Sequence, residues 1–400
     1  MSSNGALTGS IAITFTAMVG LGLVYALLPF QAMGLGATPL LVTALLATDT
    51  LAIVLSAPVL GAMSDRWGRR KVLLLALSAG PLAYLAMAFA EGLALLFFSR
   101  ILAGVANAGV SVIQAHLADV TLPEQRSSAM AGINACFGLA FVVGPLLAIA
   151  TLGPDGDNYQ TAAFAAFGAS LISVLLAWFL VRPGFVEETG KPEVKGPITL
   201  RPLLLLALPL FALLAFAFAY EAQVTTVGLW GETRLGWGAE ETSMAFMAAG
   251  VAAVMAWPIM NLRPLKALGD RTLVLGSGLF LVFGLSAFSG WFGPLATEAA
   301  ITVMALNGFS ILIGLSALQG HLSKSTPAAL QGRILGTAHA LASAARIAGP
   351  LWAGLAFEVL GPGWPSLSGA VLLALCLAVF ALAPARLPVP AALSPRRSRM

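Results

Sequence analysis

Charged side chains are scarce in this sequence of 400 residues. Aspartate, glutamate, lysine and arginine make up 10% of it, whereas hydrophobic residues make up 59%. A soluble domain carries roughly 25% charged residues, so the composition excludes an ordinary soluble fold. Cysteine is almost absent as well. The two cysteines, Cys136 and Cys376, lie within separate apolar stretches, which favours two buried free thiols over a disulfide.

The sequence also lacks the residue patterns of catalysis and of metal or cofactor binding. It has no CxxC motif, no cluster of histidine and cysteine, no catalytic triad and no phosphate-binding loop. We therefore expect no enzyme activity, no cofactor, no metal and no nucleic acid partner.

Long apolar stretches are abundant. At a rise of 1.5 Å per residue, about 20 helical residues cross a hydrocarbon core of roughly 30 Å. Twelve stretches fit this length, so we expect an all-α integral membrane protein in contact with the lipid bilayer: 9–31, 39–63, 71–90, 93–117, 129–151, 160–182, 203–229, 240–262, 272–291, 295–321, 332–357 and 365–385.

The basic residues predict the orientation of these spans. Of the 21 lysines and arginines, all except Arg100, Arg234 and Arg346 lie in the even-numbered connections and the two tails. Positively charged connections stay in the cytoplasm, so we expect a multi-pass protein of the plasma (inner) membrane with both termini cytoplasmic. The formal net charge of +4 then reflects orientation rather than an acidic partner.

An internal repeat divides the chain in two. The segments QAHLADVT (114–121) and QGHLSKST (319–326) agree at four of eight positions, with an offset of 205 residues. The same offset relates two dipeptides to their second copies: Asp65-Arg66 to Asp270-Arg271, and Gly144-Pro145 to Gly349-Pro350. Each half contains six expected spans, an even number, so the repeat is parallel, with its axis along the membrane normal.

The repeat predicts three regions. We expect an N-terminal six-helix bundle at 1–182, a polar cytoplasmic linker at 183–201, and a C-terminal six-helix bundle with a short basic tail at 202–400. Two parallel bundles of this kind enclose a cavity near the middle of the membrane.

Residues 61–71, GAMSDRWGRRK, resemble the signature that follows the second helix of major facilitator transporters. Its Gly-x-x-x-Asp-Arg-x-Gly-Arg-Arg pattern matches at Gly61, Asp65, Arg66, Gly68, Arg69 and Arg70. Gly61 would permit close helix approach. The resemblance implies that Asp65 helps to lock the cytoplasmic side shut against the other bundle. The second copy, Asp270-Arg271, lacks the glycines and the arginine pair, so we expect an asymmetric lock.

Two further segments narrow the resemblance. Residues 138–148, GLAFVVGPLLA, resemble the antiporter motif in the fifth helix of the family's exporters, with matches at Gly138, Gly144 and Pro145. Residues 118–132 are similar to the loop between helices four and five of tetracycline and multidrug efflux proteins. This resemblance to the drug:proton antiporter branch implies alternating access, a small-molecule substrate, protons as the coupling ion and a monomer.

Four charged residues are expected inside the membrane, where a charge costs ~2.5–3.5 kcal/mol or more and usually serves function. Asp49 lies ~15 Å and Arg100 ~10–12 Å from the outer surface at 1.5 Å per residue, so they could pair, as a proton site or as a static salt bridge. Arg346 is an alternative partner for Asp49. The resemblance places an arginine like Arg100 in helix four, where it would tune a nearby acid.

Glu221 is the favoured coupling acid, with Asp49 next. It lies in helix seven, which the resemblance implies lines the cavity. An apolar pocket favours the protonated form of a carboxyl group, so Glu221 could carry a proton or pair with a cationic compound. Arg346 could neutralise Glu221 or hold an anionic substrate. The alternatives are a hydrated Glu221 near the outer surface and an Arg346 that only donates packing hydrogen bonds.

Uncharged polar residues are expected to line the same cavity and bind substrate: Asn107, Gln114, Asn134, Tyr220, Gln223 and Asn307. His116 and His321 occupy equivalent positions in the two halves, which favours a structural hydrogen-bonding role, and the lone His339 is expected in the core.

The favoured function is proton-coupled export of a small hydrophobic or cationic compound. The first alternative is an importer or uniporter of a small organic anion, because the helix-five motif is imperfect and two arginines lie within the membrane. A non-transporting receptor on the same fold is a remote alternative, against which the intact GAMSDRWGRRK segment argues.

Overall fold

The computed structural model describes residues 3–121, 123–153, 156–181, 206–260, 262–290, 292–326 and 328–382. Within these ranges it contains twelve long helices and the short α10. The first bundle holds α1 (Ser3–Gly34), α2 (Pro39–Trp67), α3 (Arg69–Ala88), α4 (Leu93–Val120), α5 (Pro123–Thr151) and α6 (Tyr159–Leu180). The second holds α8 (Ala207–Leu235), α9 (Ala239–Met260), α10 (Arg263–Lys266), α11 (Asp270–Phe288), α12 (Thr297–Ser325), α13 (Ala328–Leu360) and α14 (Trp364–Leu382).

The long helices correspond one to one with the twelve expected spans, with ends shifted by a few residues, which confirms the all-α prediction. Within the described chain, eleven helices are long and apolar enough to cross a membrane. The remaining one, α5, has a shorter described apolar part, Ala135–Thr151. The expected linker at 183–201 lies outside the described residues, and the bounds of the three regions stay a prediction.

Short turns with local capping chemistry set where the helices begin and end. The Thr38 side chain accepts from the Leu41 N–H at 3.5 Å, and Pro39 begins α2 with a backbone angle suited to a first helical turn. Gly68, at φ 91°, ends α2 and allows α3 to begin directly after it. We call the end of the molecule with the turn 35–38 the outer end, and the end with Gly68 the inner end.

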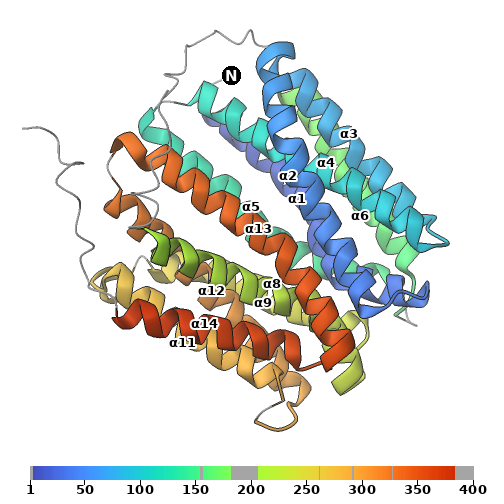
Figure 1. Ribbon diagram of the computed structural model, residues 1–400. Coiled ribbons are helices and arrows are strands. Elements are labelled where there is room, and N and C mark those ends of the chain that lie inside the picture. Colours follow the sequence, from blue (N-terminus) through green and yellow to red (C-terminus); the bar gives the residue numbers. More distant parts are fainter. Residues whose placement is uncertain are drawn as a thin grey trace, which may run out of the picture.

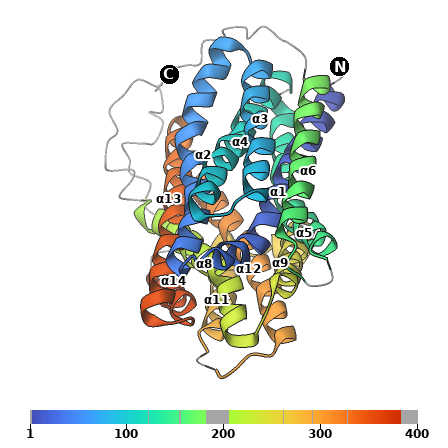
Figure 2. The same cartoon turned by 90° about the vertical axis from the view of Figure 1, so that its right-hand side faces the viewer.

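The two bundles lie side by side (Figure 1, Figure 2). Within the first, α1 packs on α5 and α6, and α4 on α2 and α3. The second repeats this pattern, because α8 packs on α13 and α14, and α12 on α9 and α11. The most extensive contacts between the bundles are those of α2 with α13 and of α5 with α9.

Glycines allow the closest approaches between helices. A Cβ atom at Gly144 of α5 would overlap backbone atoms of Gly22 and Leu23 in α1. The copy of Gly144 in the second half, Gly349 of α13, sits against the backbone of Phe218 in α8. The repeated glycine therefore performs the same packing task in both bundles. At Gly61 a Cβ atom would meet nothing within 4 Å, so the close approach expected there does not occur in this structure.

The bundles touch at the outer end. The carboxylate of Glu358, near the end of α13, accepts the Leu40 N–H of α2 at 3.2 Å. Gly354 brings α13 against Pro39 and Leu40, and Gly228 of α8 faces Pro29 and Phe30 of α1. The contacts between the two bundles therefore close the outer end.

Candidate functional site

A charge pair lies in the middle of the second bundle. The Arg346 Nε of α13 lies 3.2 Å from the Glu221 Oε1 of α8. The side chain of Glu221 is 15% exposed and that of Arg346 is 40% exposed. Gly349, one turn after Arg346, lets α13 approach α8 next to the Cβ of Glu221. Of the alternatives left open for Arg346, this contact is the one expected if Arg346 neutralises Glu221.

Two residues of the first bundle join this pair. The phenol of Tyr25 in α1 and the carboxylate of Asp49 in α2 both interact electrostatically with Arg346. Among the described residues Arg346 forms an ion pair with Glu221 and none with Asp49, so the alternative pairing of Asp49 with Arg346 is not seen in this conformation. We call Tyr25, Asp49, Glu221 and Arg346 the central cluster.

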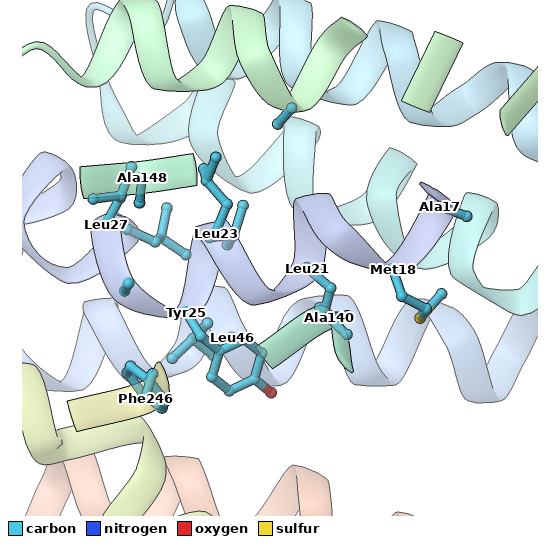
Figure 3. Close-up of a cluster of buried hydrophobic side chains, with 14 of the residues drawn as sticks. Ala17, Met18, Leu21, Leu23, Tyr25, Leu27, Leu46, Ala140, Ala148 and Phe246 are labelled. Atoms are coloured by element: carbon cyan, nitrogen blue, oxygen red, sulfur yellow. The ribbon is translucent and has the colours of Figure 1, made fainter. Parts of the chain in front are cut away.

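Sequence reasoning did not select Tyr25. Its ring packs edge-to-face on Phe141 of α5, with centroids 5.5 Å apart, and on Phe246 of α9 at 6.2 Å. Figure 3 shows the ring projecting from α1 beside Phe246 and Leu46. The sequence did hold one signal that could have selected Tyr25. The chain has only four tyrosines, and this one places a polar hydroxyl within the apolar first span.

Asp49 and Arg100 do not form an ion pair among the described residues. Asp49 is 4% exposed and accepts a long hydrogen bond, 3.5 Å, from the Asn107 amide of α4. Arg100 is 1% exposed, donates to the Ser99 hydroxyl at 3.2 Å and lies 6.0 Å from the centre of the Tyr84 ring. The expected pairing is therefore replaced by separate polar and aromatic partners.

Two of the expected substrate-binding residues bind each other. The Asn307 amide of α12 donates to the Gln223 Oε1 of α8 at 2.9 Å, and both residues are fully buried. Gly284 of α11 provides the space for the Asn307 amide. This bond links α8 and α12 beside α11, so in this conformation both side chains belong to the interior of the second bundle.

The other polar candidates are dispersed. Gln114 and Tyr220 are half-buried, and the side chain of Asn134 lies outside the described residues. His116 and His321 are half-buried near the inner end, where His321 packs edge-on against Phe380. His339, expected in the core, is exposed. In the described chain no three histidine, cysteine, aspartate or glutamate side chains are grouped so that they could hold a metal ion.

The GAMSDRWGRRK segment forms a polar network at the inner end of the first bundle. Arg69 is buried, pairs with Asp65, donates from Nη1 to the Ser64 hydroxyl at 2.6 Å, and contacts Asp119 of α4 at 2.9 Å. Arg70 donates to the Trp178 carbonyl of α6 at 2.7 Å. These contacts join α2, α3, α4 and α6, so the segment ties its own bundle together in this conformation.

The second bundle has a different inner network. Lys324 of α12 pairs with Asp270 at 2.9 Å, and Arg271 donates to the Ala381 carbonyl at the end of α14 at 2.7 Å. Lys324 is the repeat counterpart of Asp119, and Val274 is that of Arg69. In the first bundle the cation that joins α3 to α4 is Arg69 on α3. In the second bundle the cation that joins the equivalent helices, α11 and α12, is Lys324 on α12. The two copies therefore form different networks within their own bundles, and the asymmetric lock between the bundles stays a prediction.

We expect Arg69→Ala to lower the thermal unfolding midpoint of the purified protein far more than Lys324→Ala. Arg69 is 9% exposed with charged partners on two helices, and a hydrogen bond to a charged group contributes about 1.5–3 kcal/mol. The Lys324 side chain is 73% exposed, and exposed ion pairs contribute about 0–1 kcal/mol. The unfolding midpoints are measured by tryptophan fluorescence. Equal midpoints in the two variants would show that the buried network around Arg69 stabilises the protein no more than the exposed pair of Lys324 does.

The chain thus combines two bundles of six long helices, an inner motif with a partial second copy, and a charged central cluster. Residues 11–350 match the family described as the Major Facilitator Superfamily. The chain belongs to the major facilitator superfamily.

Relatives within this superfamily align over most of the chain. The class C tetracycline resistance protein of Escherichia coli is 28% identical, covering 94% of this chain and 96% of its own. The class G protein of Vibrio anguillarum is 31% identical, covering 84% and 86%. Multidrug resistance protein 2 of Bacillus subtilis (strain 168) is 24% identical, covering 86% and 87%.

Solved structures of superfamily transporters share the fold. The human organic anion transporter MFSD10 (TETRAN) superposes with a TM-score of 0.66 and 19% identity, covering 95% of this chain and 100% of its own. The nucleoside transporter NupG superposes with a TM-score of 0.72 and 12% identity, covering 94% and 99%. These transporters differ in substrate, so the shared fold does not select one.

Proposed function

We propose that this superfamily transporter exports a small hydrophobic or cationic compound in exchange for protons. The observation that carries the proposal is the central cluster, where Glu221 and Arg346 form an ion pair that also interacts electrostatically with Tyr25 and Asp49 of the other bundle. The tetracycline and multidrug resistance relatives, which align over nearly the whole chain, support an export function.

The chemistry of exchange follows from competition for Glu221. A cationic compound entering from the inner side takes the place of Arg346 at the Glu221 carboxylate. A proton arriving from the outer side neutralises the carboxylate, which removes the attraction for the compound. Because Arg346 pairs with Glu221 and also interacts electrostatically with Asp49 of the other bundle, each of these events changes the charge balance between the bundles.

The closed outer end fits the state that would accept a compound from the cytoplasm. The contacts of Glu358 and Gly354 with α2 must separate for release to the outside. In this mechanism the inner networks around Asp65 and Asp270 act when the inner end closes. Cytoplasmic termini, an inner-membrane location and a monomeric state complete the proposal.

A second candidate is uptake of a small organic anion. Arg346 favours it, because its side chain is 40% exposed beside a Glu221 that is only 15% exposed. The human protein of similar fold is an organic anion transporter. In this case the anion would take the place of Glu221 at the Arg346 guanidinium.

Purified protein in liposomes with an acidic interior and an internal pH dye separates the two candidates. We expect that external lipophilic cations, and not organic anions, will release protons from the liposomes. We also expect Glu221→Gln to abolish this release, because an amide cannot carry the proton. Glu232→Gln, an exposed acid on the same helix, is the matched control and should retain it.

The result that would contradict export is a proton flux driven by organic anions alone and lost in an Arg346→Gln variant. If cations drive the flux but Asp49→Asn abolishes it while Glu221→Gln does not, the export proposal stands. The coupling acid is then Asp49.

A further inference from the structure

Tyr25 is the member of the central cluster to which the proposed function gives no role. It lies in α1 of the first bundle and is 7% exposed. Its hydroxyl and the Arg346 guanidinium of the second bundle are close enough for a side-chain hydrogen bond. A guanidinium carries five N–H donors and no acceptor, so the hydroxyl oxygen accepts this bond. Tyr25 therefore connects α1 to α13 across the boundary between the bundles.

Aromatic neighbours from both bundles hold the Tyr25 ring in place. The rings of Tyr25, Phe141 and Phe246 contact one another in all three pairs, with centroids 5.5, 6.2 and 6.1 Å apart. Figure 3 shows the Tyr25 ring beside Phe246. A Cβ atom at Gly250, one turn after Phe246, would overlap the backbone of Phe141, so α5 and α9 are closely packed around the ring. The hydroxyl therefore stays at a fixed place.

Arg346 is the mobile partner in this arrangement. Its side chain is 40% exposed, whereas that of its partner Glu221 is 15% exposed. Its Nε lies 3.2 Å from the Glu221 Oε1, and the other donors of the guanidinium remain free to bind a second acceptor. A long, partly exposed side chain can turn between acceptors that stay fixed. Arg346 can therefore leave Glu221 and keep its bond to Tyr25.

The first bundle also attracts the guanidinium through Asp49. This carboxylate interacts electrostatically with both Tyr25 and Arg346. It is 4% exposed, and the hydrogen bond that it accepts from Asn107 is long, at 3.5 Å. A buried carboxylate with so weak a partner favours the approach of a cation. When Arg346 leaves Glu221, it therefore meets a second negative charge beside the hydroxyl.

We propose that Tyr25 is a positioning residue that holds Arg346 to the first bundle when a cationic compound takes the place of Arg346 at Glu221. The displacement rests on the proposed function, whereas the bond between Tyr25 and Arg346 does not. Loss of the hydroxyl costs little while Arg346 keeps Glu221, and more once that carboxylate is occupied. Binding of the compound then ties α13 more firmly to α1.

The first test needs no transported compound. It measures the thermal unfolding midpoint of the purified full chain with Tyr25→Phe, which keeps the ring, in three backgrounds. Glu221→Met removes the carboxylate and reproduces the state of Arg346 after displacement. There we expect Tyr25→Phe to lower the midpoint by roughly 2–4 °C more than in the unmodified protein, because a hydrogen bond to an otherwise unpaired cation is lost. In an Arg346→Met background Tyr25→Phe should cause no loss.

Two results of this test would overturn the proposal. An equal loss in all three backgrounds would show that the hydroxyl serves packing alone. No extra loss in the Glu221→Met background would show that the hydroxyl does not hold Arg346. The matched control is Tyr159→Phe, which makes the same change in a half-buried tyrosine at the start of α6 and should act alike in every background.

A binding test connects Tyr25 to the proposed function. The probe is radiolabelled tetraphenylphosphonium, a lipophilic cation. We expect Tyr25→Phe to weaken its saturable binding roughly 5–10-fold, because the displaced Arg346 loses a partner, and to have no effect in an Arg346→Met background, where nothing is displaced. Equal weakening with and without Arg346 would show direct contact with the cation and overturn the positioning role. Absence of binding to the unmodified protein, with the unfolding differences present, would contradict the export proposal alone.

Discussion

Replacing Gly144 with valine is expected to abolish the recovery of folded protein from the membrane. A Cβ atom at this position would overlap the backbone of α1 at Gly22 and Leu23, and backbone cannot move aside as a flexible side chain can. Overpacking typically costs about 1–3 kcal/mol and occasionally more. Because the overlap involves main-chain atoms, we expect the upper end of this range, visible as loss of the monodisperse gel-filtration peak.

Two other glycines provide graded controls for this prediction. At Gly138 an added Cβ would meet only the Val254 side chain of α9, so Gly138→Val should lower the yield partially. At Gly168 of α6 nothing lies within 4 Å, so Gly168→Val should leave the yield unchanged. If all three variants behave alike, the close approach of α1 and α5 is not what makes Gly144 necessary.

Removing the positive partner of Glu221 is expected to have the second large effect. Arg346→Met leaves a carboxylate that is 15% exposed without its cation. Breaking a fully buried pair costs about 3–5 kcal/mol. The cost here should be lower because the Arg346 side chain is 40% exposed. The unfolding midpoint in detergent should fall by several degrees.

A double variant tests whether the loss comes from the unpaired carboxylate. Adding Glu221→Gln to Arg346→Met removes the uncompensated charge, so the midpoint should return most of the way to that of the unmodified protein. Arg234→Met, which removes an exposed arginine at the end of α8, is the control and should change little. A double variant no more stable than Arg346→Met would show that Arg346 acts through packing instead.

The sequence alone was sufficient to predict the features that depend on the order of residues along the chain. Apolar length predicted each long helix, and the offset of 205 residues predicted that the halves repeat in parallel. The Glu221 and Arg346 contact was also predictable, since charges within a membrane require partners and few are available. The contact of Gly349 with α8 repeats that of Gly144 with α1, as the offset implies.

Features that depend on helix rotation were not predictable. Asp49 and Arg100 lie at similar expected depths, yet Asp49 faces Asn107 while Arg100 faces Tyr84. Depth follows from residue number, but the direction of a side chain around the helix follows from packing. For the same reason the hydrogen bond between Gln223 and Asn307, both expected to bind substrate, could not be foreseen. Asp119 was overlooked because it lies near the expected membrane surface. Acidic residues are common there, so there was no reason to select this one from the sequence.

The different position of the cation in the two inner networks gives the halves unequal sensitivity to ionic strength. In the first half the joining cation is Arg69, with 9% exposure, whereas in the second it is Lys324, with 73% exposure. At physiological ionic strength the screening length is about 8 Å, and dissolved salt weakens the interactions of exposed charges far more than those of buried pairs. As the salt concentration at the inner end rises, the link between α11 and α12 therefore loosens before the link between α3 and α4.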